Sequence, residues 1–377
     1  MPFRKLLYWP HLICGVLAGI VILTMSVTGV LLTYEKQMVA WSERQFDVVP
    51  PEGATALSPE ELHAFASAVD PSRPVARLIY RNDPDAAVVA VRGRSDKLYL
   101  DPYTGRVIAE GPTAMQAFMQ WTTQFHRWFA LEGASRDTAR MVTGAANLMF
   151  LFLALSGIYL WFPPVLRWVN VRKVLFFKKN ANAHARDFNW HHVMGIWSVV
   201  PLVVITATAT VFYYEWANNL VYRLAGEEVP VRGGRAPDKA PGTEAAALEG
   251  GVGLSAMLAT ASSHRQDWTS LTLAWPKPAD PLVTFTLDWG MGGEPTKKGD
   301  LLIDRASGAV AGWAGFEDKT PASKARSMVR FLHTGEALGV IGQTIAGIVS
   351  LFSAIMVWTG IALAWRKYVT PLRRKRA

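Results

Sequence analysis

Four of the eight histidines stand beside long apolar runs, where an imidazole could bind a metal centre. His11 and His191 open the first and third runs, and His126 and His333 precede the second and fourth. If the runs cross a membrane in alternating directions, each pair lies at one depth, and the two pairs lie at opposite faces. A six-coordinate haem requires two imidazoles at equal height that face each other across the macrocycle. The sequence therefore predicts two bis-histidine haem sites, His11 with His191 and His126 with His333.

Small residues follow each of these histidines at a spacing of four, which is one helical turn. Gly15 and Gly195 have this relation to the first pair, and Ala130 and Ala337 to the second. A small residue beneath a ligating histidine leaves room for a porphyrin against the backbone. The spacing therefore supports a large planar ligand at both sites.

His192 adjoins His191 and remains an alternative ligand. The residue four positions after His192 is Ile196, whose branched side chain would crowd a porphyrin, and this favours His191. The other histidines lack partners at a matching depth and are expected to be exposed to solvent: His63, His184 and His264.

Four runs without Lys, Arg, Asp or Glu must position these histidines. Each is about 22 residues long or longer, enough to cross roughly 30 Å of hydrocarbon at 1.5 Å per residue. We therefore expect four transmembrane helices, at 12–33, 141–162, 192–214 and 341–365.

The charged residues predict the orientation. Segments 1–11, 163–191 and 366–377 hold 14 of the 39 basic residues and a single acidic residue, Asp187. This is the positive-inside pattern, which puts both termini in the cytoplasm. We expect a multi-pass protein of the bacterial inner membrane, with its larger segments in the periplasm. The bilayer accounts for the pI of about 9.6, and no nucleic-acid partner is needed.

Composition excludes several other classes. Half of the residues are hydrophobic and 18% are charged, which does not fit a disordered protein. The single cysteine excludes a disulfide framework, a four-cysteine zinc site and a cysteine-bound iron–sulfur cluster.

The chain also repeats itself, which predicts two tandem halves that pack around a pseudo-two-fold axis. The Ser-Gly and Thr-Gly pairs within the repeat are interpreted as close contacts between helices. An offset of 180 places His11 on His191, Gly15 on Gly195, Thr28 on Thr208 and Tyr34 on Tyr214, and an offset of 203 places Asp101 on Asp304, Gly105 on Gly308, Gly144 on Gly347 and Ser156-Gly157 on Thr359-Gly360.

The segments outside the membrane have the pattern of two small α+β domains. In the first, Ser58 is expected to cap a helix at 59–69. Short β-branched segments predict strands, and an Asp-to-Gly turn follows them. The expected strands are 77–80, 87–92, 97–100, 271–275 and 283–289, with a second helix at 255–263 and turns at 101–105 and 304–308. The fold class is therefore a mainly α membrane protein, with four spans in two tandem repeats that each carry an extracytoplasmic α+β domain.

The order of these features resembles the PepSY-associated transmembrane proteins, an iron-regulated inner-membrane family that includes ferric-siderophore reductases. One departure is Ala209, where the pattern has glycine after Thr208. The resemblance rests on His11-x-x-x-Gly15, Thr28-Gly29, Phe125-His126-Arg127-Trp128, Ser156-Gly157-Ile158-Tyr159-Leu160-Trp161, His191-x-x-x-Gly195, Leu332-His333-Thr334-Gly335-Glu336, and the Asp-x-x-x-Gly-x-Val turns at Asp101 and Asp304.

The resemblance implies an oxidoreductase with two b-type haems that passes electrons across the inner membrane to a ferric siderophore in the periplasm. It implies no catalytic side chain beyond the haem ligands. The boundaries expected on this basis are 1–34 for the first span, 35–112 for a PepSY-like domain, 113–165 for an interfacial helix and the second span, 166–190 for a basic loop, 191–216 for the third span, 217–320 for a second PepSY-like domain, and 321–377 for an interfacial helix, the fourth span and a basic tail.

The sequence contains no strand–GxGxxG–helix unit, the pattern that binds NAD(P)H, so it does not identify the electron donor. Quinol, a flavin or a separate reductase must therefore supply the electrons. Two other functions stay open: a non-enzymatic membrane module whose PepSY-like domains bind a partner, and a haem or iron-chelate transporter. The spans carry no internal charges, and Pro201 is the one interior proline expected in them, so the pattern is less typical of a transporter.

Overall fold

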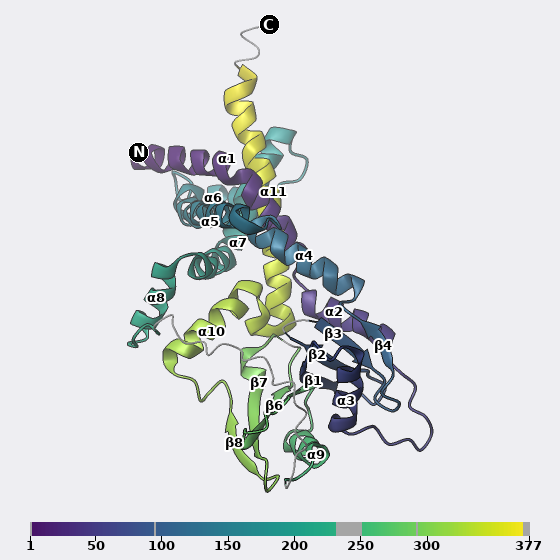
Figure 1. Ribbon diagram of the computed structural model, residues 1–377. Coiled ribbons are helices and arrows are strands. Elements are labelled where there is room, and N and C mark those ends of the chain that lie inside the picture. Colours follow the sequence, from purple (N-terminus) through teal and green to yellow (C-terminus); the bar gives the residue numbers. More distant parts are fainter. Residues whose placement is uncertain (1, 94–95, 231–250, 292, 372–377) are drawn as a thin grey trace. The chain divides into compact units, whose positions relative to one another are not determined.

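The computed structural model describes residues 2–93, 96–230, 251–291 and 293–371, which form two compact units (Figure 1). The helical unit comprises Met1–Glu35, Met119–Gly226 and Ala325–Ala377, and the sheet unit comprises Lys36–Phe118 and Glu227–Lys324. Basic residues Arg373, Arg374, Lys375 and Arg376, and the predicted domain's residues 231–250, lie outside the described residues.

Four long helices build the helical unit, and each is long and apolar enough to cross a membrane. They are α1 (Pro2–Leu31), α5 (Gly133–Trp161), α7 (Ala183–Tyr213) and α11 (Gly339–Ala364). Helices α1 and α7 each pack against both α5 and α11, which makes α1 and α7 diagonal partners. The four predicted spans are therefore confirmed as helices.

Three of these helices begin eight to ten residues before the apolar runs. The segment 166–190, predicted as a loop, in fact contains α6 (Trp168–Leu175) and the start of α7. The Asn182 side chain accepts the Ala185 N–H at 2.9 Å and so caps α7 eight residues before the histidine pair. Hydropathy detects only the apolar part of a helix. Because α1 begins before its apolar run, Pro10 lies inside a long helix, as Pro201 does in α7.

The chain also contains shorter helices and single helical turns. The additional helices expected at the starts of segments 113–165 and 321–377 form as α4 and α10. The short helices are α2 (Glu35–Glu43), α4 (Ala114–Trp128), α8 (Glu215–Leu224) and α10 (Pro321–Thr334), with 3-10 turns at Arg44–Phe46, Pro295–Lys297 and Glu336–Leu338 and a π-helical turn at Trp365–Val369.

A buried carboxylate ties the predicted cytoplasmic ends of α7 and α11 together. Asp187 is 1% exposed, and its Oδ2 accepts Arg366 Nη1 at 2.7 Å while Oδ1 accepts Arg186 Nη2 at 2.9 Å. We expect Asp187→Asn to lower the free energy of unfolding by about 1–3 kcal/mol, because it leaves two guanidinium groups without their counter-charge. Thermal unfolding followed by circular dichroism measures this. Asp267→Asn, at an exposed ion pair with Arg265, should change stability little, and equal melting temperatures for both variants would contradict the prediction.

The sheet unit contains one antiparallel sheet of eight strands in the order β4-β3-β2-β1-β5-β6-β7-β8. Two separate domains are expected from sequence, but β1 and β5 pair along their edges, with Leu78 opposite Leu273, and join the halves into one sheet. An unpaired edge strand is prone to pair with another strand, and here each half covers the edge of the other. The strands are β1 (Val75–Arg81), β2 (Val88–Arg92), β3 (Asp96–Leu100), β4 (Val107–Glu110), β5 (Ser270–Ala274), β6 (Leu282–Asp288), β7 (Lys298–Asp304) and β8 (Val310–Ala314).

Two helices, α3 (Pro59–Val69) and α9 (Leu254–His264), lie against the sheet (Figure 1). Ser58 caps α3 with a full capping box, as predicted. Leu62 of α3 and Met257 of α9 are each at most 1% exposed, and each packs into the apolar core of its own half. Both Asp-to-Gly turns form as expected, with φ of +71° at Gly105 and +69° at Gly308.

One histidine of the sheet unit differs from expectation. His63 is half-buried and stacks on Trp275, with ring centroids 3.5 Å apart and planes 9° apart. Burial lowers the pKa of His63 to about 4. The sequence could not predict this contact because Trp275 comes from the other half of the sheet, whereas His184 and His264 are exposed as expected.

Candidate functional site

His11 is held at one end of the helix bundle by a serine on a neighbouring helix. Its Nδ1 lies 2.8 Å from Ser156 Oγ of α5. The Ser156 hydroxyl also lies 2.7 Å from Phe152 O, and a hydroxyl that donates its single proton to this carbonyl accepts the Nδ1–H of His11. This hydrogen bond fixes the tautomer and leaves Nε2 with a free lone pair, which is the form that binds a metal.

His126 at the other end is held in the same way by α1. Its Nδ1 lies 2.8 Å from Thr28 Oγ1, and that hydroxyl donates its own proton to Thr24 O at 2.7 Å. The Thr28 oxygen is therefore an acceptor, and His126 also keeps Nε2 unprotonated. The two sites share one local design although they lie at opposite ends of α1.

The third and fourth histidines add a backbone carbonyl to this arrangement. His191 Nδ1 lies 3.1 Å from Met356 O and 3.2 Å from Thr359 Oγ1 of α11. Because a carbonyl can only accept a hydrogen bond, the Nδ1 of His191 must carry the proton.

His333 repeats this pattern on α7, with Nδ1 2.9 Å from Ile205 O and 3.3 Å from Thr208 Oγ1. The Thr208 hydroxyl donates to Val204 O at 2.6 Å. In all four predicted ligands Nδ1 thus lies within hydrogen-bonding distance of a hydroxyl oxygen from another helix, an arrangement that favours the tautomer with an unprotonated Nε2.

The Ser-Gly and Thr-Gly pairs therefore do more than bring helices together. The hydroxyl of each pair binds a histidine, and the glycine leaves space beside that ring. A Cβ added at Gly157 would lie 3.7 Å from His11 Cε1, and one added at Gly360 would lie 3.2 Å from His191 Cε1. The repeat contained a signal for this role, because Ser156 and Thr359, which are related by an offset of 203, hold His11 and His191, which are themselves related by an offset of 180.

His11 and His191 line one cavity inside the helical unit, with a volume of about 700 Å³. Cofactor pockets commonly measure about 300–1,000 Å³. Gly15 and Gly195 also line this cavity, as expected if they leave room for a planar ligand. The ring of His191 is within electrostatic reach of His11, so the cavity brings the predicted pair together.

His192 lines the same cavity but is held differently. Its Nδ1 lies 2.8 Å from Phe188 O, one turn back on its own helix, and no hydroxyl from another helix takes part among the described residues. A ring anchored to its own helix is less restricted than one anchored across the bundle. The anchoring pattern common to the other four histidines therefore favours His191 as the ligand.

His126 and His333 lie near each other at the other end of the helical unit. Burial, and then the neighbouring His333, lower the pKa of His126 to about 4. Burial also lowers the pKa of His333. Both imidazoles are therefore neutral at neutral pH, the state in which histidine coordinates a metal.

The small residues expected beneath this second pair are not on the helical face. Helix α4 ends at Trp128, and Phe129 and Ala130 have positive φ values of 55° and 53°. Helix α10 likewise ends at Thr334, before Ala337. The spacing argument from Ala130 and Ala337 was therefore wrong, because it assumed that both helices continue past these points.

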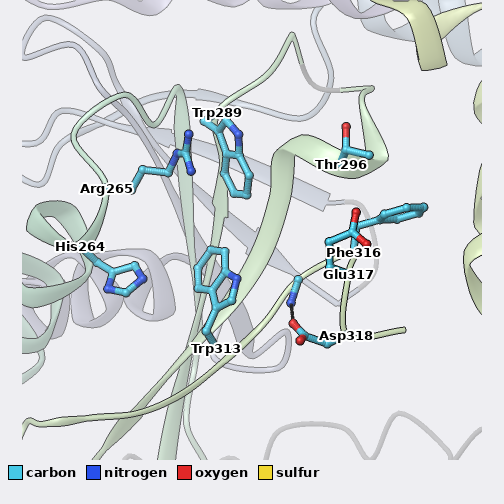
Figure 2. A pocket seen from close by; sticks show the side chains of 9 residues that line it. His264, Arg265, Trp289, Thr296, Trp313, Phe316, Glu317 and Asp318 are labelled. Atoms are coloured by element: carbon cyan, nitrogen blue, oxygen red, sulfur yellow. Dashed lines mark hydrogen bonds between the residues drawn. The ribbon is translucent and has the colours of Figure 1, made fainter. Parts of the chain in front are cut away.

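A second hollow, of about 440 Å³, lies in the sheet unit at the end of α9 and was not predicted (Figure 2). Arg265 lies over the Trp289 ring at 3.9 Å, and Trp313 is 36% exposed beside it, with ring centroids 5.9 Å apart. Figure 2 shows Asp318 on the opposite wall, where it accepts the Gly315 N–H at 2.7 Å. The walls carry both signs of charge, so charge alone selects no ligand.

The equivalent corner of the first half carries ion pairs between side chains. Glu110 lies opposite Leu98 as Trp313 lies opposite Leu301. Glu110 and Asp96 bind Arg92, which is 1% exposed. The position that holds Trp313 beside the hollow in the second half thus holds an ion-paired glutamate in the first.

The fold and the site define a membrane protein with four apolar helices and a separate antiparallel sheet unit. The profile of the family described as PepSY-associated TM region matches residues 8–367, so the chain belongs to this family. No curated protein matches the chain.

Proposed function

We propose that the protein carries two b-type haems and passes electrons across the bacterial inner membrane to ferric siderophore iron in the periplasm. His11 and His191 bind the inner haem, and His126 and His333 the outer one. The observation that carries this proposal is the set of four hydrogen bonds that leave every Nε2 free. Four imidazoles with the same tautomer, in two couples at opposite ends of one bundle, fit two bis-histidine haems.

The four histidines and the hydroxyls that hold them fit a bound haem. Each hydroxyl fixes the orientation of its imidazole and keeps the proton on Nδ1, which raises the basicity of Nε2. Gly15 and Gly195 line the inner cavity and have no side chain that would occupy it. Two bound haems would supply one-electron carriers near the two faces of the membrane, and their saturated coordination favours electron transfer over oxygen activation.

The orientation follows from the basic segments, which put both termini in the cytoplasm. We propose that the two halves are tandem repeats, since each half contributes one histidine to each pair. The donor, a quinol or a separate reductase, loses one electron for each ferric ion reduced to ferrous iron. Reduction weakens binding of iron by hard oxygen ligands and so releases it from the chelate.

The test is a spectrum of the purified full chain. We expect a Soret band, α and β bands that sharpen on reduction, and two haems per chain by pyridine haemochrome. Anaerobic addition of a ferric siderophore should reoxidise the reduced protein and produce Fe²⁺, which ferrozine traps. A colourless protein would favour the partner-binding module instead. A haem protein that transfers no electrons to ferric chelates would contradict the proposed acceptor.

Removing one anchoring hydroxyl should weaken the site without removing the ligand. Ser156→Ala deletes the hydroxyl that binds His11 Nδ1, whereas Ser156→Thr keeps a hydroxyl of the kind found at the other three sites. We expect roughly tenfold weaker retention of the inner haem in Ser156→Ala. Transfer of haem to apomyoglobin measures this. Ser198→Ala removes a buried serine that binds no histidine and should have no effect; equal loss in both alanine variants would indicate a packing effect.

A further inference from the structure

The charged residues that line the inner cavity are all cations. Arg4 comes from the start of α1, and Arg366 and Lys367 follow the end of α11. Within the described part of the chain, the lining of this cavity includes no Asp or Glu. A cavity with an apolar body and a cationic mouth is complementary to a ligand that is apolar with anionic groups at one edge.

Arg4 is fixed in place and still has donors to spare. Its Nη1 donates to Phe162 O and its Nη2 to Leu160 O, each at 2.8 Å. These bonds use two of the five N–H donors of the guanidinium. They tie the start of α1 to the end of α5, so the position of the remaining donors costs little entropy to maintain.

Lys367 also has a fixed position and unused donors. Its Nζ donates to Tyr8 OH at 2.9 Å, and it lies 4.5 Å from the centroid of the Tyr8 ring. Arg366 is paired with Asp187, but no carboxylate partner of Arg4 or Lys367 occurs among the residues described. Two positive charges therefore remain uncompensated at the mouth of the cavity.

The positive-inside rule alone does not account for this placement. Lys5 satisfies that rule equally well, yet its side chain is exposed and does not line the cavity, whereas Arg4 is half-buried and does. Adjacent residues on one helix point in different directions, and the bonds to the end of α5 hold the Arg4 guanidinium, unlike the Lys5 amine, beside the cavity.

We infer that Arg4 and Lys367 bind the two propionate carboxylates of the inner haem. The inference rests on the proposed function, and it adds which edge of the macrocycle faces the cytoplasmic mouth. Charge-assisted hydrogen bonds to carboxylates are among the stronger ones in proteins. The two cations therefore select a tetrapyrrole with free acid groups over one without them.

The test compares two forms of the ligand in the full chain. A His126→Ala background restricts reconstitution to the inner site, which is loaded with iron protoporphyrin IX or with its dimethyl ester. We expect the protein that retains Arg4 and Lys367 to bind the free acid at least tenfold more tightly than the ester. Arg4→Gln and Lys367→Gln should each reduce this preference about tenfold, whereas Lys5→Gln should leave it unchanged.

Arg4→Lys keeps a cation and should retain most of the preference, which separates loss of charge from loss of the α1–α5 contact. Equal affinity of the starting protein for acid and ester would overturn the inference while leaving a haem protein intact. The inference would also be overturned if substitution of Arg4 or Lys367 left the haem affinity unchanged while anionic lipid altered it. That result would assign the two cations to lipid headgroups. Absence of any haem binding would instead refute the proposed function.

Discussion

His11→Ala is expected to lower the haem content from two per chain to one. Without His11 the inner iron keeps one protein ligand, and a b-type haem has no covalent bond to retain it. The Ser156 hydroxyl, which accepts from His11 at 2.8 Å, then has no imidazole to orient. The pyridine haemochrome of the purified variant, divided by its protein concentration, measures this. The outer site shares no ligand with the inner one, so its spectrum should be unchanged.

His333→Ala should remove the other haem, and the double variant should contain none. The matched control is His184→Ala, which changes an exposed histidine that lines the inner cavity without a hydroxyl anchor among the described residues. It should retain both haems. Retention of two haems by His11→Ala, or loss of both by either single variant, would contradict the assignment of two independent couples.

The second large effect concerns the adjacent histidines of α7. His191→Ala should lose the inner haem, whereas His192→Ala should keep it. The reason is the anchoring: His191 Nδ1 is bound across the bundle by Met356 O and Thr359 Oγ1, while His192 Nδ1 is bound, among the residues that the structure describes, by Phe188 O of its own helix. Haem content and the low-spin ferric spectrum report the outcome.

Thr359→Val provides a check on the same argument, because it removes the hydroxyl partner of His191 but keeps the shape of the side chain. It should weaken haem retention in the same direction as His191→Ala and by a smaller amount. Loss of haem in His192→Ala with full retention in His191→Ala would reverse the assignment, and would show that the cross-bundle hydrogen bonds serve only packing.

Much of the fold could be predicted because the relevant physics is local. An apolar run without charges can be accommodated as a helix across a bilayer, so composition alone located the four spans. The Ser58 cap, the α3 helix and the Gly105 turn also depend on neighbours within a few positions of the chain. The polar start of α7 was missed, and the spacing argument wrongly extended α4 to Ala130 and α10 to Ala337, since hydropathy and spacing do not report where a helix begins or ends.

The candidate site was predicted in part. The repeat and the alternating directions of the helices predicted two pairs of histidines. The helical unit holds all four through equivalent hydrogen bonds. Their hydroxyl partners had been interpreted as packing residues. The difference arises because Ser156 lies 145 positions from His11 and Thr28 lies 98 positions from His126. No local pattern specifies which side chain on a neighbouring helix will face a given ring.

By itself, the sequence determined four membrane-length helices, the histidines near their ends and the secondary structure of the sheet unit, because these depend on side-chain polarity and short-range backbone preferences. Only the tertiary structure decided that β1 pairs with β5, that His63 stacks on Trp275, and that the Nδ1 of each ligand candidate faces an oxygen atom on another helix. These three features depend on backbone or ring atoms from distant segments meeting at hydrogen-bonding or van der Waals distance, which packing of the whole chain controls.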